Sequence, residues 1–326
     1  MSKTAAHRQH SEDSIFYSAT AVEFTRAGAS HATLDNYNMN LDAKEAFKRL
    51  LVQHKGDATH PEVNAALEKL VQLAAKDRED DQAWSPAYSM DANNGMWRSI
   101  TTPPFPGKLP DDGDGKSKFT LGRMSFGMFK PTKLVCAVEK IFNQIQQVDE
   151  ADVVRTEEKQ NDAGGGQPEW KQTYNIQVMM EMETPAGKLP ARLTNFGFCF
   201  PKSATRLGVI FSSGRLEPNF DLTKNLALAV LWKETFDVGI AKEAEAQSYV
   251  SRFLSIVTFK VMDLMMGLKP PTYDGVNFTQ TFEIGRPYNG HLDIIYLDED
   301  LRVTRGNKGT IVVAERVQRV VENDLE

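Results

Sequence analysis

The chain has 326 residues and a formal net charge of −6, with 41% hydrophobic and 25% charged residues. This is an ordinary globular composition, sufficient for one large domain or two modest ones with a sizeable core. The acidic balance and the lack of a lysine- or arginine-rich run argue against nucleic acid as a partner.

The first part of the chain predicts a polar tail followed by helices. Residues 1–40 are polar and aperiodic, and we expect a disordered tail. Residues 41–78 are expected to form N-terminal helices, because Phe47, Leu50 and Leu51 recur at helical spacing. The N-terminus has no apolar core of the kind found in secretory signals, and no stretch of the sequence is apolar enough to span a bilayer.

From Gly95 onward the apolar period changes to two, which predicts about eight to ten antiparallel strands in a barrel or sandwich. The clearest example is 174–183, where apolar and polar residues alternate as in a strand buried on one face. The segments 119–129 and 133–145 are expected to be two strands. The predicted fold is therefore mainly β, an antiparallel barrel over residues 79–326.

A helical insertion at 221–270 interrupts this pattern and ends at two prolines. Its second half is expected to form a helix over about 245–267 that lies across one barrel end. Met262, Met265 or Met266 would then face the cavity or solvent.

Residue types that usually carry catalysis or bind metals are sparse. Five of the six histidines precede the β region, which holds only His291. No metal-ligand spacing, phosphate-binding glycine loop or nucleophile elbow is present, so we predict no metal, no cofactor and no enzyme. Cys136 and Cys199 lie in apolar runs and are expected to be buried free thiols.

Within the stretch "LDEDL", Asp298 and Asp300 form a pair of carboxylates that could do acid–base work. We favour a structural interpretation, since aspartates at turns bond their own backbone. Arg302 and Arg305 are close enough in sequence to pair with these acids.

The stretch "YLDEDLRVTRGNKGTIVV" resembles the C-terminal signature of the plastid lipid-associated protein family, also called the PAP/fibrillin family. The matching residues are Tyr296, Leu297, Asp298, Leu301, Arg302, Arg305, Gly306, Gly309 and Thr310. Upstream, Gly95 and Trp97 resemble the opening of lipocalin-like barrels, in which the tryptophan closes one end against an arginine of the last strand. Arg316 is the expected arginine, with Arg302 or Arg305 as alternatives.

This resemblance implies a non-enzymatic barrel that binds hydrophobic small molecules such as lipids, prenyl-quinones or carotenoids. It also implies association with lipid globules or thylakoid membranes in a plastid; without that resemblance the expected location is cytoplasmic. The alternative is a structural or adaptor protein whose helical insertion docks a protein partner.

The predicted barrel wall is rich in methionine and phenylalanine, and flexible methionines suit an irregular apolar cavity. A plainly packed core is an equal alternative, since small barrels are often filled by side chains. The interior candidates are Met124, Phe126, Met128, Met180, Met182, Phe198 and Phe211.

Overall fold

The structure is a computed structural model that describes residues 31–76, 85–110, 113–148, 172–246, 267–286 and 289–317. Within these residues the helices are α1 (His31–Gln53), α2 (Pro61–Lys76), α3 (Met90–Asn93), α4 (Leu121–Met124) and α6 (Leu226–Ala246). The strands are β1 (Gly95–Ser99), β2 (Ser117–Thr120), β3 (Val135–Gln147), β4 (Gln172–Thr184), β5 (Gly187–Pro201), β6 (Arg206–Pro218), β7 (Thr272–Asp274), β8 (Thr279–Glu283), β9 (Gly290–Leu297), β10 (Leu301–Gly306) and β11 (Ile311–Arg316).

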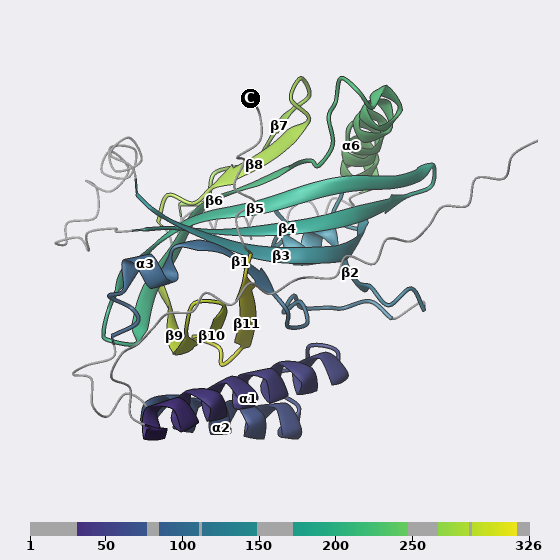
Figure 1. The fold of residues 1–326 in the computed structure, drawn as a ribbon. Coiled ribbons are helices and arrows are strands. Elements are labelled where there is room, and N and C mark those ends of the chain that lie inside the picture. Colours follow the sequence, from purple (N-terminus) through teal and green to yellow (C-terminus); the bar gives the residue numbers. More distant parts are fainter. Residues whose placement is uncertain are drawn as a thin grey trace, which may run out of the picture.

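Eight of the described strands close into an antiparallel barrel in the order β5-β4-β3-β1-β11-β10-β9-β6, and the pairing of β6 with β5 completes the ring. The other described strands are attached to this ring, β2 beside β3 and the β7–β8 hairpin beside β6 (Figure 1). Closure removes the unpaired edges that an open sheet would expose. The predicted mainly β fold is confirmed, including one sheet built from both sides of the insertion.

Strand β4 illustrates why the period of two predicted this architecture. Tyr174, Val178, Met180 and Met182 are buried on one face, while the residues between them are more exposed. The expected turn follows, and Gly187 adopts a φ of +144°, which favours glycine.

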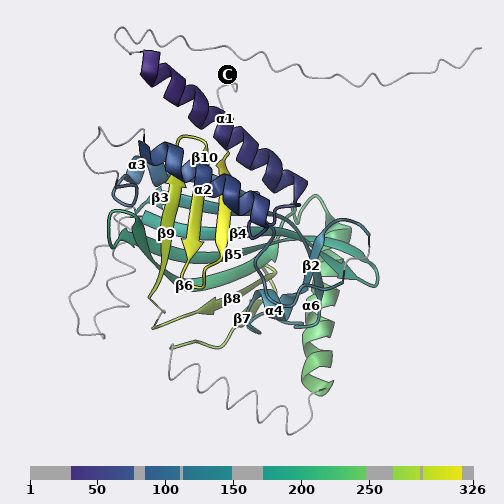
Figure 2. The same ribbon diagram turned by 90° about the horizontal axis from the view of Figure 1, so that it is seen from below.

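Helices α1 and α2 cover the outer face of the C-terminal strands, as Figure 2 shows from below. Phe47 and Leu51 of α1 and Leu67 of α2 share a buried apolar cluster with Leu301 and Val303 of β10. The second face of β10 is turned to the barrel interior. Both faces of this strand are therefore buried, as the burial of Leu301, Arg302, Val303 and Thr304 shows.

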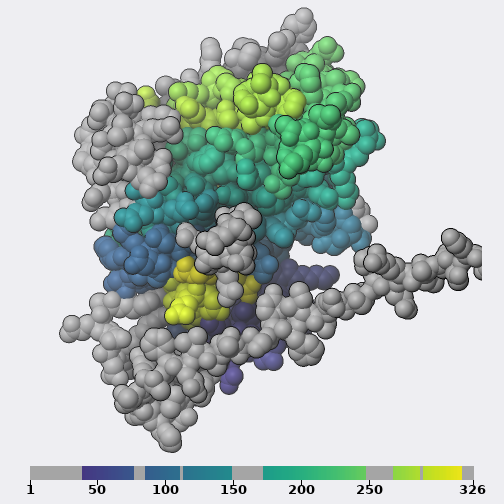
Figure 3. Space-filling model, turned by 45° about the horizontal axis from the view of Figure 1, so that its top comes forward, coloured from purple at the N-terminus to yellow at the C-terminus, as the bar shows by residue number. Residues whose placement is uncertain are grey.

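Helix α6 confirms that a helix lies between the later strands. Its Trp232 and Phe236 are buried in the largest apolar cluster together with Met180 and Met182 of β4. The Phe236 ring lies 6.3 Å from the Tyr273 ring of β7, and α6 and the β7–β8 hairpin lie side by side on one face of the molecule (Figure 3). The predicted positions of Met262, Met265 and Met266 lie outside the described residues.

Two boundaries differ from the sequence-based prediction. Helix α1 begins at His31, earlier than residue 41, because no proline or glycine interrupts the sequence from His31 to Gln53. The segment 119–129 is not one strand, since β2 ends at Thr120 and α4 follows. The Ser125 hydroxyl donates to the Leu121 carbonyl, 2.8 Å away, and this side-chain bond stabilises the turn.

Candidate functional site

Trp97 of β1 has no solvent exposure. The guanidinium carbon of Arg316 lies 4.1 Å from the centroid of the Trp97 ring. The indole Nε1–H donates to the Asn93 carbonyl of α3, 2.9 Å away. The predicted packing of Arg316 on Trp97 is confirmed, and neither Arg302 nor Arg305 takes this position.

Arg316 also ties the first strand to the last. Its guanidinium donates to the carbonyls of Ala92 and Asn94, just before β1. Gly95 has a φ of +129°, and a Cβ at this position would lie 2.8 Å from Arg316 Nη1. Glycine is favoured here by the backbone conformation, and a Cβ would also force the Arg316 guanidinium to shift.

The turn between β9 and β10 is organised by the Asp298 carboxylate. It accepts hydrogen bonds from the Tyr296 hydroxyl (2.6 Å) and from the amides of Leu301 (2.7 Å) and Asp300 (3.0 Å). Lys44 of α1 binds both Asp298 (3.0 Å) and Asp300 (2.6 Å). The structural interpretation of the two aspartates is supported, because their oxygens already serve the turn and the docking of α1.

The expectation that Arg302 and Arg305 pair with these acids is wrong. Lys44 from the N-terminal helices occupies that position, which local sequence could not reveal. Arg305 is exposed. Arg302 points to the other face of β10, into the barrel, and is only 1% exposed.

Arg302 is a buried cation packed against the neutral ring of Tyr174, and Arg316 is a second cation within electrostatic range of it. The guanidinium carbon of Arg302 lies 5.5 Å from the centroid of the Tyr174 ring. The Tyr174 hydroxyl in turn accepts a hydrogen bond from the Asn143 amide at 3.1 Å. Among the described residues, no group accepts a hydrogen bond from Arg302 Nε or Nη2, and no carboxylate forms an ion pair with it. Tyr174 and Asn143 were not recognised from the sequence as parts of a site.

The seven candidates for the barrel interior fall into three groups: the four methionines, Phe211, and the two other phenylalanines. Met180 and Met182 face the interior cluster as predicted, and Met124 and Met128 are buried against it from α4 and the following turn. Phe211 is partly buried, with its ring 6.3 Å from the Tyr174 ring.

Two phenylalanines were placed wrongly in the interior. Phe126 follows α4 and is 79% exposed, because the expected strand ends before it. Phe198 lies on the face of β5 opposite to Cys199, whose side chain is in the interior cluster.

Ile176 connects two apolar clusters inside the barrel. One contains Trp97 and Tyr174, the other Met180 and Met182, and Ile176 packs against both. It shares the inner face of β4 with these residues, yet it is only partly buried. Between Tyr174 and Met182, Ile176 is the inward-facing residue of β4 that keeps accessible surface.

The C-terminal strands of this barrel were compared with known families. The PAP_fibrillin family model matches residues 274–315. This PAP_fibrillin segment runs from the end of β7 into β11 and therefore includes the Asp298 turn and Arg302. The match and the closed barrel are consistent with a lipocalin-like fold. No curated protein and no solved structure matches the chain.

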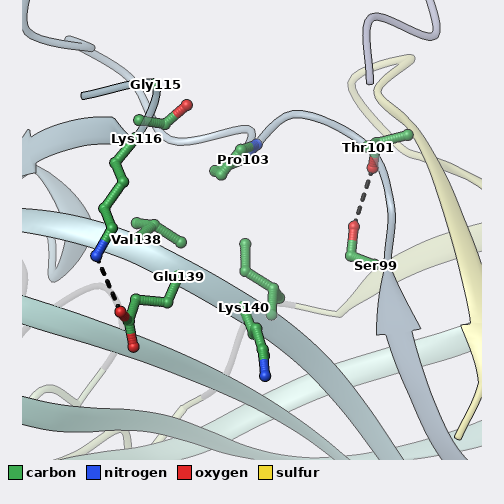
Figure 4. A pocket seen from close by; sticks show the side chains of 10 residues that line it. Ser99, Thr101, Pro103, Gly115, Lys116, Val138, Glu139 and Lys140 are labelled. Atoms are coloured by element: carbon green, nitrogen blue, oxygen red, sulfur yellow. Dashed lines mark hydrogen bonds and ion pairs between the residues drawn. The ribbon is translucent and has the colours of Figure 1, made fainter. Parts of the chain in front are cut away.

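A surface pocket of about 500 Å³ lies outside the PAP_fibrillin segment, where β3 changes partners. Strand β3 pairs with β2 as far as Val138 and with β1 from Phe142. Figure 4 shows Lys116 reaching Glu139 on one side of this notch, 3.0 Å away. Two lining residues, Val138 and Ile141, belong to the interior apolar cluster. The notch therefore reaches from the surface to the core.

One group of potential metal ligands occurs among the described residues, His54, His60 and Glu62, with their ligand atoms within 4.8 Å of one another. The two imidazoles stack at 3.5 Å, and His54 Nε2 lies 3.0 Å from Glu62 Oε2. Stacked rings direct their nitrogen lone pairs side by side, so one ring would have to turn before both could bind one ion.

The two thiols are free and buried, as predicted. Burial raises the pKa of Cys136 and of Cys199 to about 12, which keeps both protonated and unreactive at neutral pH. Among the helices of the described ranges, none has the length and apolarity needed to cross a membrane.

Proposed function

We propose that the barrel binds a hydrophobic small molecule, such as a lipid, prenyl-quinone or carotenoid, without catalysing a reaction on it. The observation that carries this proposal is the accessible surface of Ile176 on the inner face of a closed barrel. Apolar space enclosed by a barrel favours ligands with few polar groups. The PAP_fibrillin match supports the same class of ligand by resemblance.

The barrel wall suits a ligand of variable shape. Met180 and Met182 lie on the same inner face as Ile176, and methionine side chains adapt readily to irregular apolar surfaces. A ligand that enters through the notch between β1 and β2 would meet Val138 and Ile141 first. The proposed path thus runs from the notch to the space beside Ile176.

Association with lipid globules or thylakoid membranes of a plastid is part of this proposal. The resemblance to PAP_fibrillin supports it, and so does α6, which exposes Leu226 (70%), Val230 (57%) and Val238 (46%). Apolar side chains on an exposed helix favour contact with an apolar surface. The same residues favour the second candidate, an adaptor whose insertion docks a protein partner.

Organic extraction of the purified protein followed by mass spectrometry tests the first candidate against the second. We expect apolar molecules to co-purify with the wild-type chain, and Ile176→Phe to reduce their amount several-fold by filling the space beside β4. Phe126→Ala is the matched control, since Phe126 is outside the barrel and its loss should change nothing. A folded wild-type protein that yields no apolar molecule would favour the adaptor.

A further inference from the structure

The guanidinium of Arg302 interacts with the neutral Tyr174 hydroxyl, but the described residues supply no anion to pair with its charge. Arginine remains protonated in proteins at any ordinary pH. Burying a cation is strongly unfavourable unless an anion or several hydrogen-bond acceptors compensate it. Arg302 is 1% exposed, yet Nε and Nη2 lack acceptors within the described ranges. A fold that places a guanidinium there gains most when an anion binds.

The two unpartnered nitrogens indicate the shape of the missing anion. Nε–H and Nη2–H project from the same edge of the planar guanidinium, so they form two parallel donors. This fork matches the two oxygens of a carboxylate. The opposite face of the site is provided by the Tyr174 ring, and the Tyr174 hydroxyl already accepts a hydrogen bond from Asn143. Its own proton remains available for an anion oxygen.

The barrel limits where the rest of such a ligand can lie. The packed pair of Trp97 and Arg316 lies near Arg302, because Ala314, the β11 partner of Arg302, is two residues from Arg316. From Tyr174 the inner face of β4 continues through Ile176 and Val178 to Met180 and Met182. That face spans about 26 Å at ~3.3 Å per residue, which matches the length of a long alkyl chain. Val178, Met180 and Met182 have almost no accessible surface, so the chain would have to displace the two flexible methionine side chains.

We propose that the ligand is a long-chain carboxylate whose head group binds Arg302 and whose chain lies along the inner face of β4 past Ile176. This inference rests on the proposed function and narrows it from apolar molecules in general to those with a terminal carboxylate. Neutral quinones and carotenoids would leave the guanidinium unpaired.

Titrations with palmitate and with hexadecanol, which has the same chain length and no charge, test the inference. We expect the wild-type protein to bind palmitate on the order of tenfold to a hundredfold more tightly than hexadecanol, the range for hydrogen bonds to charged groups. Arg302→Gln should abolish this preference and leave the affinity for hexadecanol unchanged. Arg302→Lys, which keeps the charge without the fork, should fall between them.

Arg305→Gln is the matched control, because Arg305 lies on the same strand with an exposed side chain. It should retain the wild-type preference. Equal wild-type affinities for palmitate and hexadecanol, a result that needs no variant, would overturn the carboxylate inference and leave the proposed function intact. A preference for palmitate that persists in Arg302→Gln would overturn it as well. Failure of the wild-type protein to bind either probe would refute the proposed function itself.

Discussion

Replacement of Trp97 by alanine is expected to lower the free energy of unfolding by about 3–5 kcal/mol. The substitution removes a completely buried indole, its hydrogen bond to Asn93 and the surface on which Arg316 packs. Urea unfolding of the two proteins, followed by circular dichroism, measures the difference.

Conservative replacements separate packing from the indole hydrogen bond. Trp97→Phe keeps an aromatic ring but removes the donor to Asn93, and should cost about 1–2 kcal/mol more than Trp232→Phe. Trp232 is the matched control because it is equally buried and, among the described residues, its Nε1 has no hydrogen-bond acceptor. Equal losses for the two tryptophans would contradict a stabilising role for the hydrogen bond from the Trp97 indole to the Asn93 carbonyl.

Asp298→Ala is expected to lower the free energy of unfolding by about 2–4 kcal/mol. The carboxylate accepts hydrogen bonds from two amides and a hydroxyl and binds Lys44, so its loss leaves several donors without an acceptor. Asp300→Ala is the control, because the Asp300 side chain is 55% exposed and its ion pair with Lys44 should contribute about 1 kcal/mol or less. A larger loss of stability for Asp300→Ala than for Asp298→Ala would contradict the assignment of Asp298 as the residue that organises the turn.

The contribution of Asp298 should also depend on pH. Partial burial raises the pKa of Asp298, but hydrogen bonds from Tyr296, Asp300, Leu301 and Lys44 lower it more, and the pKa lies below its ordinary value. The folded state therefore binds the proton less tightly than the unfolded state. The stabilisation is complete above the unfolded pKa of about 3.9 and is lost as the pH falls through the folded pKa. The stability difference between wild type and Asp298→Asn should shrink accordingly below about pH 4.

The sequence predicted the barrel well because most strands have one buried face. In β4 the alternation of Tyr174, Val178, Met180 and Met182 with polar residues identified both the strand and its inner face. The Trp97–Arg316 contact was also predictable, since it depends on the first and last strands of a closed sheet. Short segments were less predictable: a serine and two glycines turn the chain after Thr120, where an apolar run had suggested a strand.

The position of Arg302 could not be predicted, for a different physical reason. Both faces of β10 are buried, one by α1 and α2 and the other by the barrel interior. Alternation alone then does not distinguish the inner face from the outer one. The N-terminal helices that decide the question are far away in sequence, as is Lys44, which takes the place expected for Arg302 beside Asp298. From the sequence, the Arg302 guanidinium was therefore expected at the surface, paired with the aspartates of the turn.

The most direct test of the central claim, that an apolar ligand binds inside the barrel, is methyl nuclear magnetic resonance of the protein with and without palmitate. We expect the methyl signals of Ile176, Met180 and Met182 to shift on binding. The signal of Met39, which is 48% exposed on α1, should stay unchanged. Saturable binding that leaves the three interior methyl signals unshifted would contradict binding inside the barrel.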